Sequence, residues 1–412
     1  MIQFNKIRLD NGLRLIHHYD SATKMVALNL LYNVGSKHED PNKTGLAHFM
    51  EHLMFSGSKN VQGFDDVLQT AGGSSNAWTN VDMTNYYETL PVHNIETALW
   101  VESDRLVDLT LSDASINIQR DVVIEEFKQR YLNEPYGDLS HAMHDLAYVK
   151  HPYKWPTIGK RVEHISDVSK HDIISFYKRF YSVDNLIMCV SGNISFDDTV
   201  RLVEKYFGDI TPSAVHSPVI DAEPRQCEQR IMNMSGDVPQ NLICRVYHMP
   251  GRCGKDYPAC DLLSDVLSNG KSSRFYQNIL SKSGVFADLD AAIEGTNEPG
   301  LFLIRGRLVD GVSFEQADEI IDKQLSALLQ DGVTQYELDK CLNKFHAAML
   351  FDNISYQEKA TKLCEYELLG DAQLFNNEVN RYRLTTTDSL VETARELFDP
   401  SNCSRIYYSK KD

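Results

Sequence analysis

Two stretches of this chain repeat one order of segments: a strand-like apolar run, a polar loop and an apolar helix-like run. They cover residues 28–58 and 242–273, and they lie at similar distances from the starts of the two halves of the chain. Strands and helices of this kind must bury their apolar sides against a second layer. The repeat therefore favours two similar domains that arose by duplication over two unrelated ones.

Further strand-like runs alternate with longer helical segments, such as 314–330 and 335–352. This alternation predicts the α+β class, with two homologous domains that each consist of an antiparallel sheet covered by helices. The 412 residues are enough for two cores. Proline, small and charged residues gather near 213–228, so we expect a linker there between domains at 1–212 and 229–412.

The charge and the cysteines restrict the partners and the compartment. A net charge of −17 argues against binding nucleic acid through its phosphates. The sequence has no apolar run long enough to cross a bilayer. The eight cysteines are irregularly spaced, and no pair has the spacing of metal ligands. We therefore expect reduced thiols and a cytoplasmic protein.

The first residues after Met1 predict a β-hairpin with an Asn-Gly or Asp-Gly turn, in IRLDNGLRLI. Folded structure would then begin within a few residues of the start. A cleaved leader is not expected.

His48, Glu51 and His52, in the stretch GLAHFMEHLMFSG, carry the clearest chemistry. On a helix, positions i and i+4 project from the same face, so the two imidazoles are able to share one metal ion. Glu51 lies directly beside His52, which is the His-x-x-Glu-His order of a zinc hydrolase with a glutamate base. The spacing predicts a metal site with a catalytic carboxylate on one helix.

The residues around this motif predict a largely buried helix. Thr44 suits an N-cap and Gly57 suits the position after the last turn, so we expect a helix over about residues 45–56. Five residues give it a wide apolar surface: Leu46, Phe49, Met50, Leu53 and Met54. Burying two imidazoles and a carboxylate beside that surface is costly without a partner. This favours a bound metal over two histidines buried for structure alone.

A catalytic zinc takes three protein ligands and keeps one position for water, so a third ligand must come from elsewhere. The best candidate is a helix expected at 112–131. Ser112 or Asp113 is expected to cap this helix. Val122, Val123 and Phe127 are expected to pack inward. Glu125 and Glu126 on this helix point about 100° apart, so only one of them is able to face the metal. Periodicity does not choose between them, and paired glutamates are often a solvated face.

Together these segments resemble the M16 metallopeptidases, the family of pitrilysin, insulin-degrading enzyme and the mitochondrial processing peptidase. The likeness extends over nearly the whole chain and is closest to the branch with subunits of this length. Residues 45–58 are similar to the family's metal-binding helix, and residues 71–91 to its Asn-Ala segment. Residues 120–127 are similar to its second metal helix, and residues 185–195 to the closing strand of its first domain. In the second metal helix the family's ligand is the second glutamate, which implies Glu126.

This chain departs from the family pattern at two places. The family commonly has a glutamate seven residues before its metal-binding glutamate, where this chain has Gln119, which does not titrate but is able to hydrogen-bond. The family also has an Arg and a Tyr that contact the substrate near the scissile bond. The corresponding positions here are Leu280 and Ala287, whereas Arg274 and Tyr276 belong to an upstream segment.

In some two-chain relatives one subunit bears the metal motif and the other bears the Arg/Tyr pair. The resemblance therefore implies a zinc-dependent endopeptidase subunit that needs a related Arg/Tyr-bearing partner in a heterodimer, with a homodimer as the alternative arrangement. His48, His52 and Glu126 would hold Zn²⁺ and Glu51 would be the base. Two imidazoles and a carboxylate suit zinc, without excluding Mn²⁺ or Co²⁺.

The resemblance implies that peptides or unfolded segments, held in a chamber, are the substrates. Residues 73–79 are expected to form an edge strand onto which such a peptide adds. Asn76 and Ala77 are then candidate substrate contacts, although the same residues also suit an ordinary turn and strand entry. The alternative function is a non-catalytic structural or assembly subunit, which the residues at the departing positions favour.

Overall fold

The computed structural model describes residues 1–213 and 218–411. These residues pack into two compact units, each assembled from three pieces of the chain. The pieces of the first unit are Met1–Gln129, Trp155–Ile220 and Leu350–Asn377, and those of the second are Arg130–Lys154, Asp221–Met349 and Glu378–Asp412.

Each unit therefore contains segments from both halves of the chain, so no single boundary in the sequence separates the two units. The expected domains at 1–212 and 229–412 stay a prediction. Of the expected linker at 213–228, residues 214–217 lie outside the described part of the chain.

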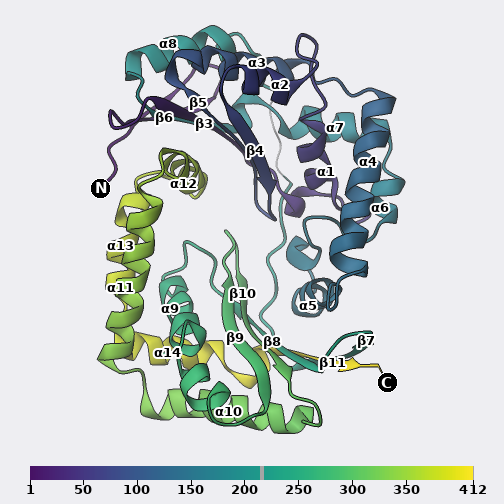
Figure 1. The fold of residues 1–412 in the computed structure, drawn as a ribbon, viewed down its shortest axis with the longest axis vertical. Helices are drawn as coiled ribbons and strands as arrows, with labels where there is room; N and C mark the ends of the chain where they lie inside the picture. Colours follow the sequence, from purple (N-terminus) through teal and green to yellow (C-terminus); the bar gives the residue numbers. More distant parts are fainter. Residues whose placement is uncertain (214–217, 412) are drawn as a thin grey trace. The chain divides into compact units, whose positions relative to one another are not determined.

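The first unit contains a six-stranded sheet with the order β1-β2-β6-β3-β5-β4 (Figure 1). Its strands are β1 Asn5–Arg8, β2 Arg14–Tyr19, β3 Met25–Tyr32, β4 Ser74–Thr79, β5 Thr84–Pro91 and β6 Leu186–Gly192. The expected N-terminal hairpin is confirmed, because β1 pairs with β2 in antiparallel register. Strand β4 is the last strand at one edge of the sheet, and its inner neighbour is β5.

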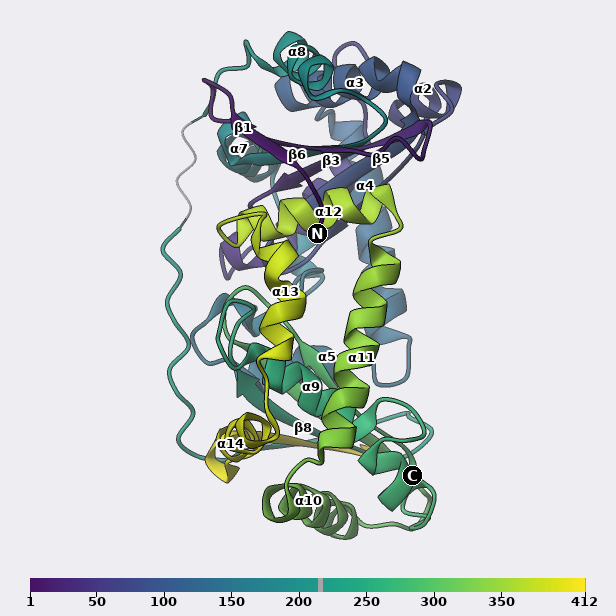
Figure 2. The same ribbon diagram turned by 90° about the vertical axis from the view of Figure 1, so that its left-hand side faces the viewer.

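Helices cover both faces of this first sheet. The helices of this unit are α1 Leu46–Leu53, α2 Phe64–Thr70, α3 Ile95–Val107, α4 Asp113–Phe127, α6 Glu163–Ser166, α7 Lys170–Phe180, α8 Phe196–Phe207 and α12 Tyr356–Leu368. Helix α12 packs on β3 and β6 from the side opposite to α3 and α8 (Figures 1 and 2). Strand β6 is consequently buried along its whole length, as expected for a strand with helices on both sides.

The second unit contains a five-stranded sheet with the order β7-β11-β8-β10-β9. Its strands are β7 Arg230–Gly236, β8 Leu242–Met249, β9 Phe286–Glu294, β10 Gly300–Leu308 and β11 Cys403–Lys410, and its helices are α5 Leu139–Ala147, α9 Tyr257–Ser268, α10 Phe314–Asp331 and α14 Thr387–Leu397. Two more helices, α11 Gln335–Asp352 and α13 Leu374–Arg383, run from one unit into the other. Helix α5 packs on β7, β8 and β11, while α9 packs on β9.

Five strands of the first sheet, β2-β6-β3-β5-β4, repeat the order of the second sheet, and β1 is an additional edge strand. In each sheet the strand that comes last in sequence, β6 or β11, lies between two earlier strands and is parallel to one and antiparallel to the other. The expectation of purely antiparallel sheets is therefore wrong in this detail. The two strands beside β6, β2 and β3, run in opposite directions, and so do β7 and β8 beside β11. A strand inserted between such neighbours must be parallel to one of them. The α+β class with two helix-covered sheets is confirmed.

Candidate metal centre

Helix α1 begins at Leu46, and its N-terminus is held by a carboxylate that the sequence did not reveal. Gly45 has a φ of 90° and forms the left-handed entry to the helix. A Cβ at this glycine would lie 2.5 Å from the carbonyl oxygen of Ile158, so the position admits glycine alone. Glu39 accepts the backbone N–H of Gly45 at 2.8 Å and that of Ala47 at 2.7 Å. A distant glutamate thus satisfies two donors at the start of the helix.

The expected cap at Thr44 is wrong, because its hydroxyl is engaged elsewhere. The Thr44 Oγ1 lies 2.8 Å from His164 Nδ1 and accepts the backbone N–H of Lys160. Burial raises the pKa of Glu39 to about 8, although the N–H groups of Ala47 and Gly45 act in the opposite direction. The helix is also shorter than expected and ends at Leu53, with Gly57 in a left-handed turn further on.

The fold selects Glu126 rather than Glu125 as the residue that faces the histidines. Helix α4 is capped by Ser112, whose Oγ accepts the backbone N–H of Ser115, so one of the two expected caps is confirmed. The Glu125 side chain is 71% exposed and pairs with Lys128. The Glu126 side chain is 19% exposed and points at both imidazoles.

The side of α4 that packs inward explains this choice. Val123 and Phe127 are buried as expected, whereas Val122 is exposed, contrary to the expectation. Glu126 follows Val123 by three positions and precedes Phe127 by one, so its side chain lies on the same inward side of the helix.

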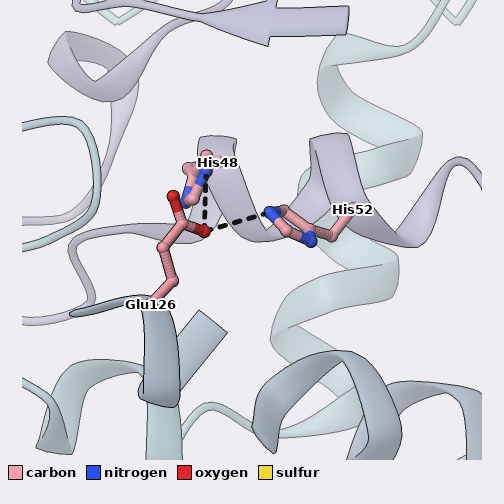
Figure 3. A group of neighbouring side chains, drawn as sticks. All are labelled: His48, His52 and Glu126. Atoms are coloured by element: carbon pink, nitrogen blue, oxygen red, sulfur yellow. Dashed lines mark ion pairs between the residues drawn. The ribbon is translucent and has the colours of Figure 1, made fainter. Parts of the chain in front are cut away.

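His48, His52 and Glu126 form one compact group between α1 and α4 (Figure 3). The distance from His48 Nε2 to Glu126 Oε2 is 3.7 Å, and that from His52 Nε2 to the same oxygen is 3.5 Å. Tetrahedral zinc with bonds near 2.0–2.1 Å places its ligand atoms about 3.3 Å apart. Within residues 1–213 and 218–411 it is the one group of three or more potential metal-ligating side chains. The donor set and its spacing fit a zinc ion.

The charge of Glu126 changes the titration of His52. Burial lowers the pKa of His52, but the hydrogen bond and the negative charge of Glu126 outweigh it, so the pKa is raised. The charge of Glu51 and, to a smaller extent, the side chain of Gln119 also act to raise this pKa. The expectation that Gln119 is able to hydrogen-bond stays a prediction.

Glu51 projects from α1 toward the edge strand β4. Thr79, the last residue of that strand, donates its hydroxyl hydrogen to Glu51 Oε2 at 2.5 Å. Sequence reasoning did not single out Thr79, because its contact depends on how a strand docks against a helix 28 positions away. Asn76 and Ala77 lie on the same strand, and the Asn76 side chain accepts the Ala77 N–H at 2.8 Å.

Helix α9 of the second unit carries no histidine. Asp261, Ser264 and Asp265 on this helix have the same sequence spacing as His48, Glu51 and His52 on α1. Asp261 accepts the hydroxyl of Tyr382 at 2.5 Å, and Ser264 donates to the backbone of its own helix. These side chains serve local structure.

Leu280 and Ala287 lie in the second unit, in a short π-helical turn and at the start of β9. Leu280 packs against the apolar core of that unit, and Ala287 is exposed. Neither side chain has a hydrogen-bond donor.

The chain belongs to the M16 peptidase family. The profile described as Insulinase (Peptidase family M16) matches residues 14–161, and the profile described as Peptidase M16 inactive domain matches residues 167–345. All of the candidate metal centre lies within the first match, and the second covers most of the half without metal ligands.

Several known proteins are similar to this chain. The zinc protease PqqE of Helicobacter pylori is 28% identical over 412 residues, which cover 97% of this chain and 91% of that protein. A solved structure of a protease from Helicobacter pylori matches with a TM-score of 0.93 at 27% identity, over 99% of this chain and 100% of that one. The probable mitochondrial-processing peptidase subunit beta of Schizosaccharomyces pombe is 31% identical over 212 residues, 50% of this chain and 45% of that protein.

In the part of the chain that the structure describes, no helix has both the length and the apolar character needed to cross a membrane.

Proposed function

We propose that this chain is a zinc-dependent endopeptidase subunit. The observation that carries the proposal is the convergence of His48, His52 and Glu126 at distances that suit a tetrahedral zinc. Relatives of similar length are named zinc proteases, which supports both the metal and the reaction class. Zinc is preferred because two imidazoles and a carboxylate are typical of its catalytic sites.

Each residue has a distinct role in the proposed reaction. His48, His52 and Glu126 would hold the ion. Zinc bound there would polarise a peptide carbonyl and lower the pKa of a bound water. Glu51 would be the base that takes the proton of the attacking water and passes it to the leaving amine.

A peptide or an unfolded segment is the proposed substrate, and β4 is its proposed docking strand. The strand is an edge of the first sheet, so main-chain groups on its outer side are open to a further strand. Asn76 and Ala77 would contact the substrate there. Both are at least partly exposed, which supports this placement.

A partner subunit is the second element of the proposal. Leu280 and Ala287 supply no group that would stabilise the oxyanion formed during cleavage. A related chain with an Arg and a Tyr would supply it in a heterodimer, whereas a homodimer, the alternative arrangement, would add no such pair. One relative is named as a subunit, which agrees with an assembly of more than one chain. A cytoplasmic location also stays part of the proposal, supported by eight cysteines that are all free.

The proposal is tested by measuring zinc content and cleavage of unfolded casein, for the pure chain and for the chain mixed with a related Arg/Tyr-bearing subunit. We expect one zinc per chain, slow cleavage alone and faster cleavage in the mixture. Glu51→Gln should retain zinc and lose cleavage. Strong cleavage by the pure chain would exclude the need for a partner. Stoichiometric zinc without cleavage in any mixture would favour the non-catalytic assembly subunit.

A further inference from the structure

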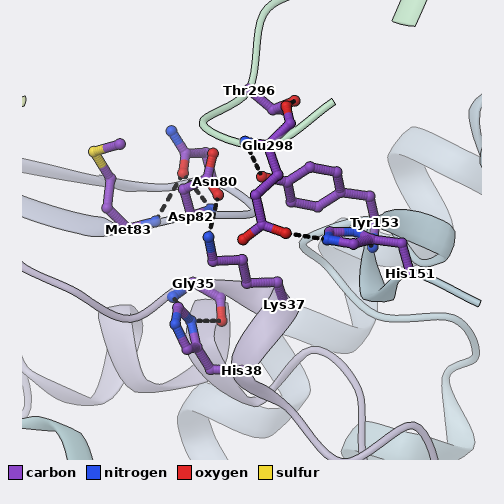
Figure 4. Close-up of polar contacts among 10 residues, drawn as sticks. All are labelled: Gly35, Lys37, His38, Asn80, Asp82, Met83, His151, Tyr153, Thr296 and Glu298. Atoms are coloured by element: carbon purple, nitrogen blue, oxygen red, sulfur yellow. Dashed lines mark hydrogen bonds and ion pairs between the residues drawn. The ribbon is translucent and has the colours of Figure 1, made fainter. Parts of the chain in front are cut away.

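The hairpin between β4 and β5 is held against the loop that follows β3. Asn80 accepts the N–H groups of Asp82 and Met83 at 2.8 and 2.9 Å, which closes the turn on itself (Figure 4). Lys37 and Asp82 form an ion pair of 2.8 Å, with side chains that are 9% and 3% exposed. Breaking a buried pair of this kind is costly, so the turn has little freedom.

Backbone contacts tie the same turn to residues 35–37. The N–H of Ser36 donates to the carbonyl of Asn80 at 3.2 Å, and that of Lys37 donates to Val81 at 3.0 Å. A Cβ at Gly35 would lie 2.4 Å from the Asn80 carbonyl oxygen, so the two segments are packed as closely as a glycine allows. The turn is fixed from both sides.

Thr79 precedes this turn directly and pairs with Thr84 in the hairpin register. Thr84 is itself held, since its hydroxyl donates to the Val34 carbonyl at 2.8 Å. The backbone that carries Thr79 is therefore held in place. Its hydroxyl donates to Glu51 Oε2 at 2.5 Å. A charged acceptor makes this one of the stronger kinds of hydrogen bond.

We propose that Thr79 is a positioning residue that sets the orientation of the Glu51 carboxylate, and that it links this orientation to peptide docking because it lies on β4 itself. This inference rests on the proposed function. One strand then has two tasks: its outer edge receives the peptide main chain, and its last side chain holds the base.

The test compares Thr79→Val, which keeps the shape and removes the hydroxyl, with Thr79→Ser, which keeps the hydroxyl. Both are made in the full chain, which is loaded with zinc and mixed with the related subunit, and unfolded casein is the probe. We expect Thr79→Val to lower kcat by roughly tenfold to a hundredfold with little change in KM, since misplacing a catalytic group costs about that much. Thr79→Ser should restore most of kcat, and all three proteins should bind one zinc.

A second readout does not depend on activity. Crystal structures of the zinc-loaded chains should show the Glu51 carboxylate in the same place in the wild type and in Thr79→Ser, and rotated in Thr79→Val. An unchanged carboxylate, or equal kcat values, would overturn the inference. If the wild type binds zinc but never cleaves, the proposed function fails, and the Glu51 orientation alone decides the inference.

Discussion

Arg274 Nε donates to Glu337 Oε1 at 2.7 Å, and its Nη2 donates to Glu337 Oε2 at 2.9 Å. The same guanidinium donates to the Gly332 carbonyl at the end of α10. Arg274 is the arginine nearest in sequence to the departing positions Leu280 and Ala287, and this pairing occupies it within the second unit. It joins the end of α10 to the start of α11, which is a structural role.

The Arg274–Glu337 pair should make stability depend on acid pH. Burial alone would raise the pKa of Glu337, but Arg274 and Thr334 outweigh it and hold the pKa at about 2. Because this pKa is lower in the folded chain than the ordinary 4.5, the stabilisation is present above pH 4.5 and is lost as the pH falls toward 2. After allowance for solvent screening, Glu337→Gln should cost about 2 kcal/mol at pH 7 and less at pH 3.

Urea unfolding at the two pH values measures this difference. Asp339→Asn is the matched control, because Asp339 is an exposed residue on the same helix whose carboxylate accepts only a local bond from Gln335. An equal loss for Glu337→Gln at pH 7 and pH 3 would contradict the assignment.

The two neighbouring glutamates of α4 should differ sharply in metal binding. Glu126→Gln removes a charged ligand and should weaken zinc affinity by about tenfold to a hundredfold or more, judged by the effect of even indirect changes at metal sites. Glu125→Gln should leave it unchanged, since that carboxylate is 71% exposed and pairs with Lys128. Competition with a chromogenic zinc chelator measures both. Equal affinities for the two variants would remove Glu126 from the ligand set.

Glu39 should stabilise the helix that carries both histidines. Glu39→Ala leaves the N–H groups of Gly45 and Ala47 without their acceptor in a buried place, so the free energy of unfolding should fall by about 2–3 kcal/mol. Zinc affinity should fall as well, because the start of α1 becomes less ordered. Asp40→Ala, a change at the exposed neighbour, removes only the bonds that Asn42 donates at the surface and should lower stability by less, about 0.5–1 kcal/mol.

A buried polar cluster should attach α12 to the first sheet. Asn29 and Asn85 exchange side-chain hydrogen bonds of 2.8 and 3.0 Å, and Thr361 on α12 donates to Asn29 at 2.9 Å. Asn29→Ala leaves two buried partners and should cost about 3 kcal/mol, whereas Thr361→Val leaves the asparagine pair intact and should cost about 1 kcal/mol. Chemical denaturation measures the loss in the free energy of unfolding for each variant. A larger loss for Thr361→Val than for Asn29→Ala would assign most of the cluster's stabilisation to the bond from α12.

Much of the metal centre was predictable because it depends on local periodicity. The spacing of His48 and His52 places both rings on one helical face whatever the rest of the chain does. The choice of Glu126 over Glu125 came from resemblance to a family, and the fold agrees because Val123 and Phe127 turn that side of α4 inward. The local sequence predicts Thr44 as the cap, but its hydroxyl contacts His164, which lies 120 positions away. Such a distant partner is not visible in the local sequence.

The amino-acid sequence by itself determined the α+β class, the repeated order of strand, loop and helix in the two halves, and the placement of His48 and His52 on one face of a helix, since these follow from hydrophobic periodicity and residue spacing. Only the tertiary structure decided which distant groups complete them. Glu39 at the start of α1, Thr79 beside Glu51, the strands β6 and β11 inserted between earlier ones, and the exchange of α5 and α12 between the units all depend on long-range packing. Such contacts are chosen by the burial of whole elements, and no short pattern encodes them.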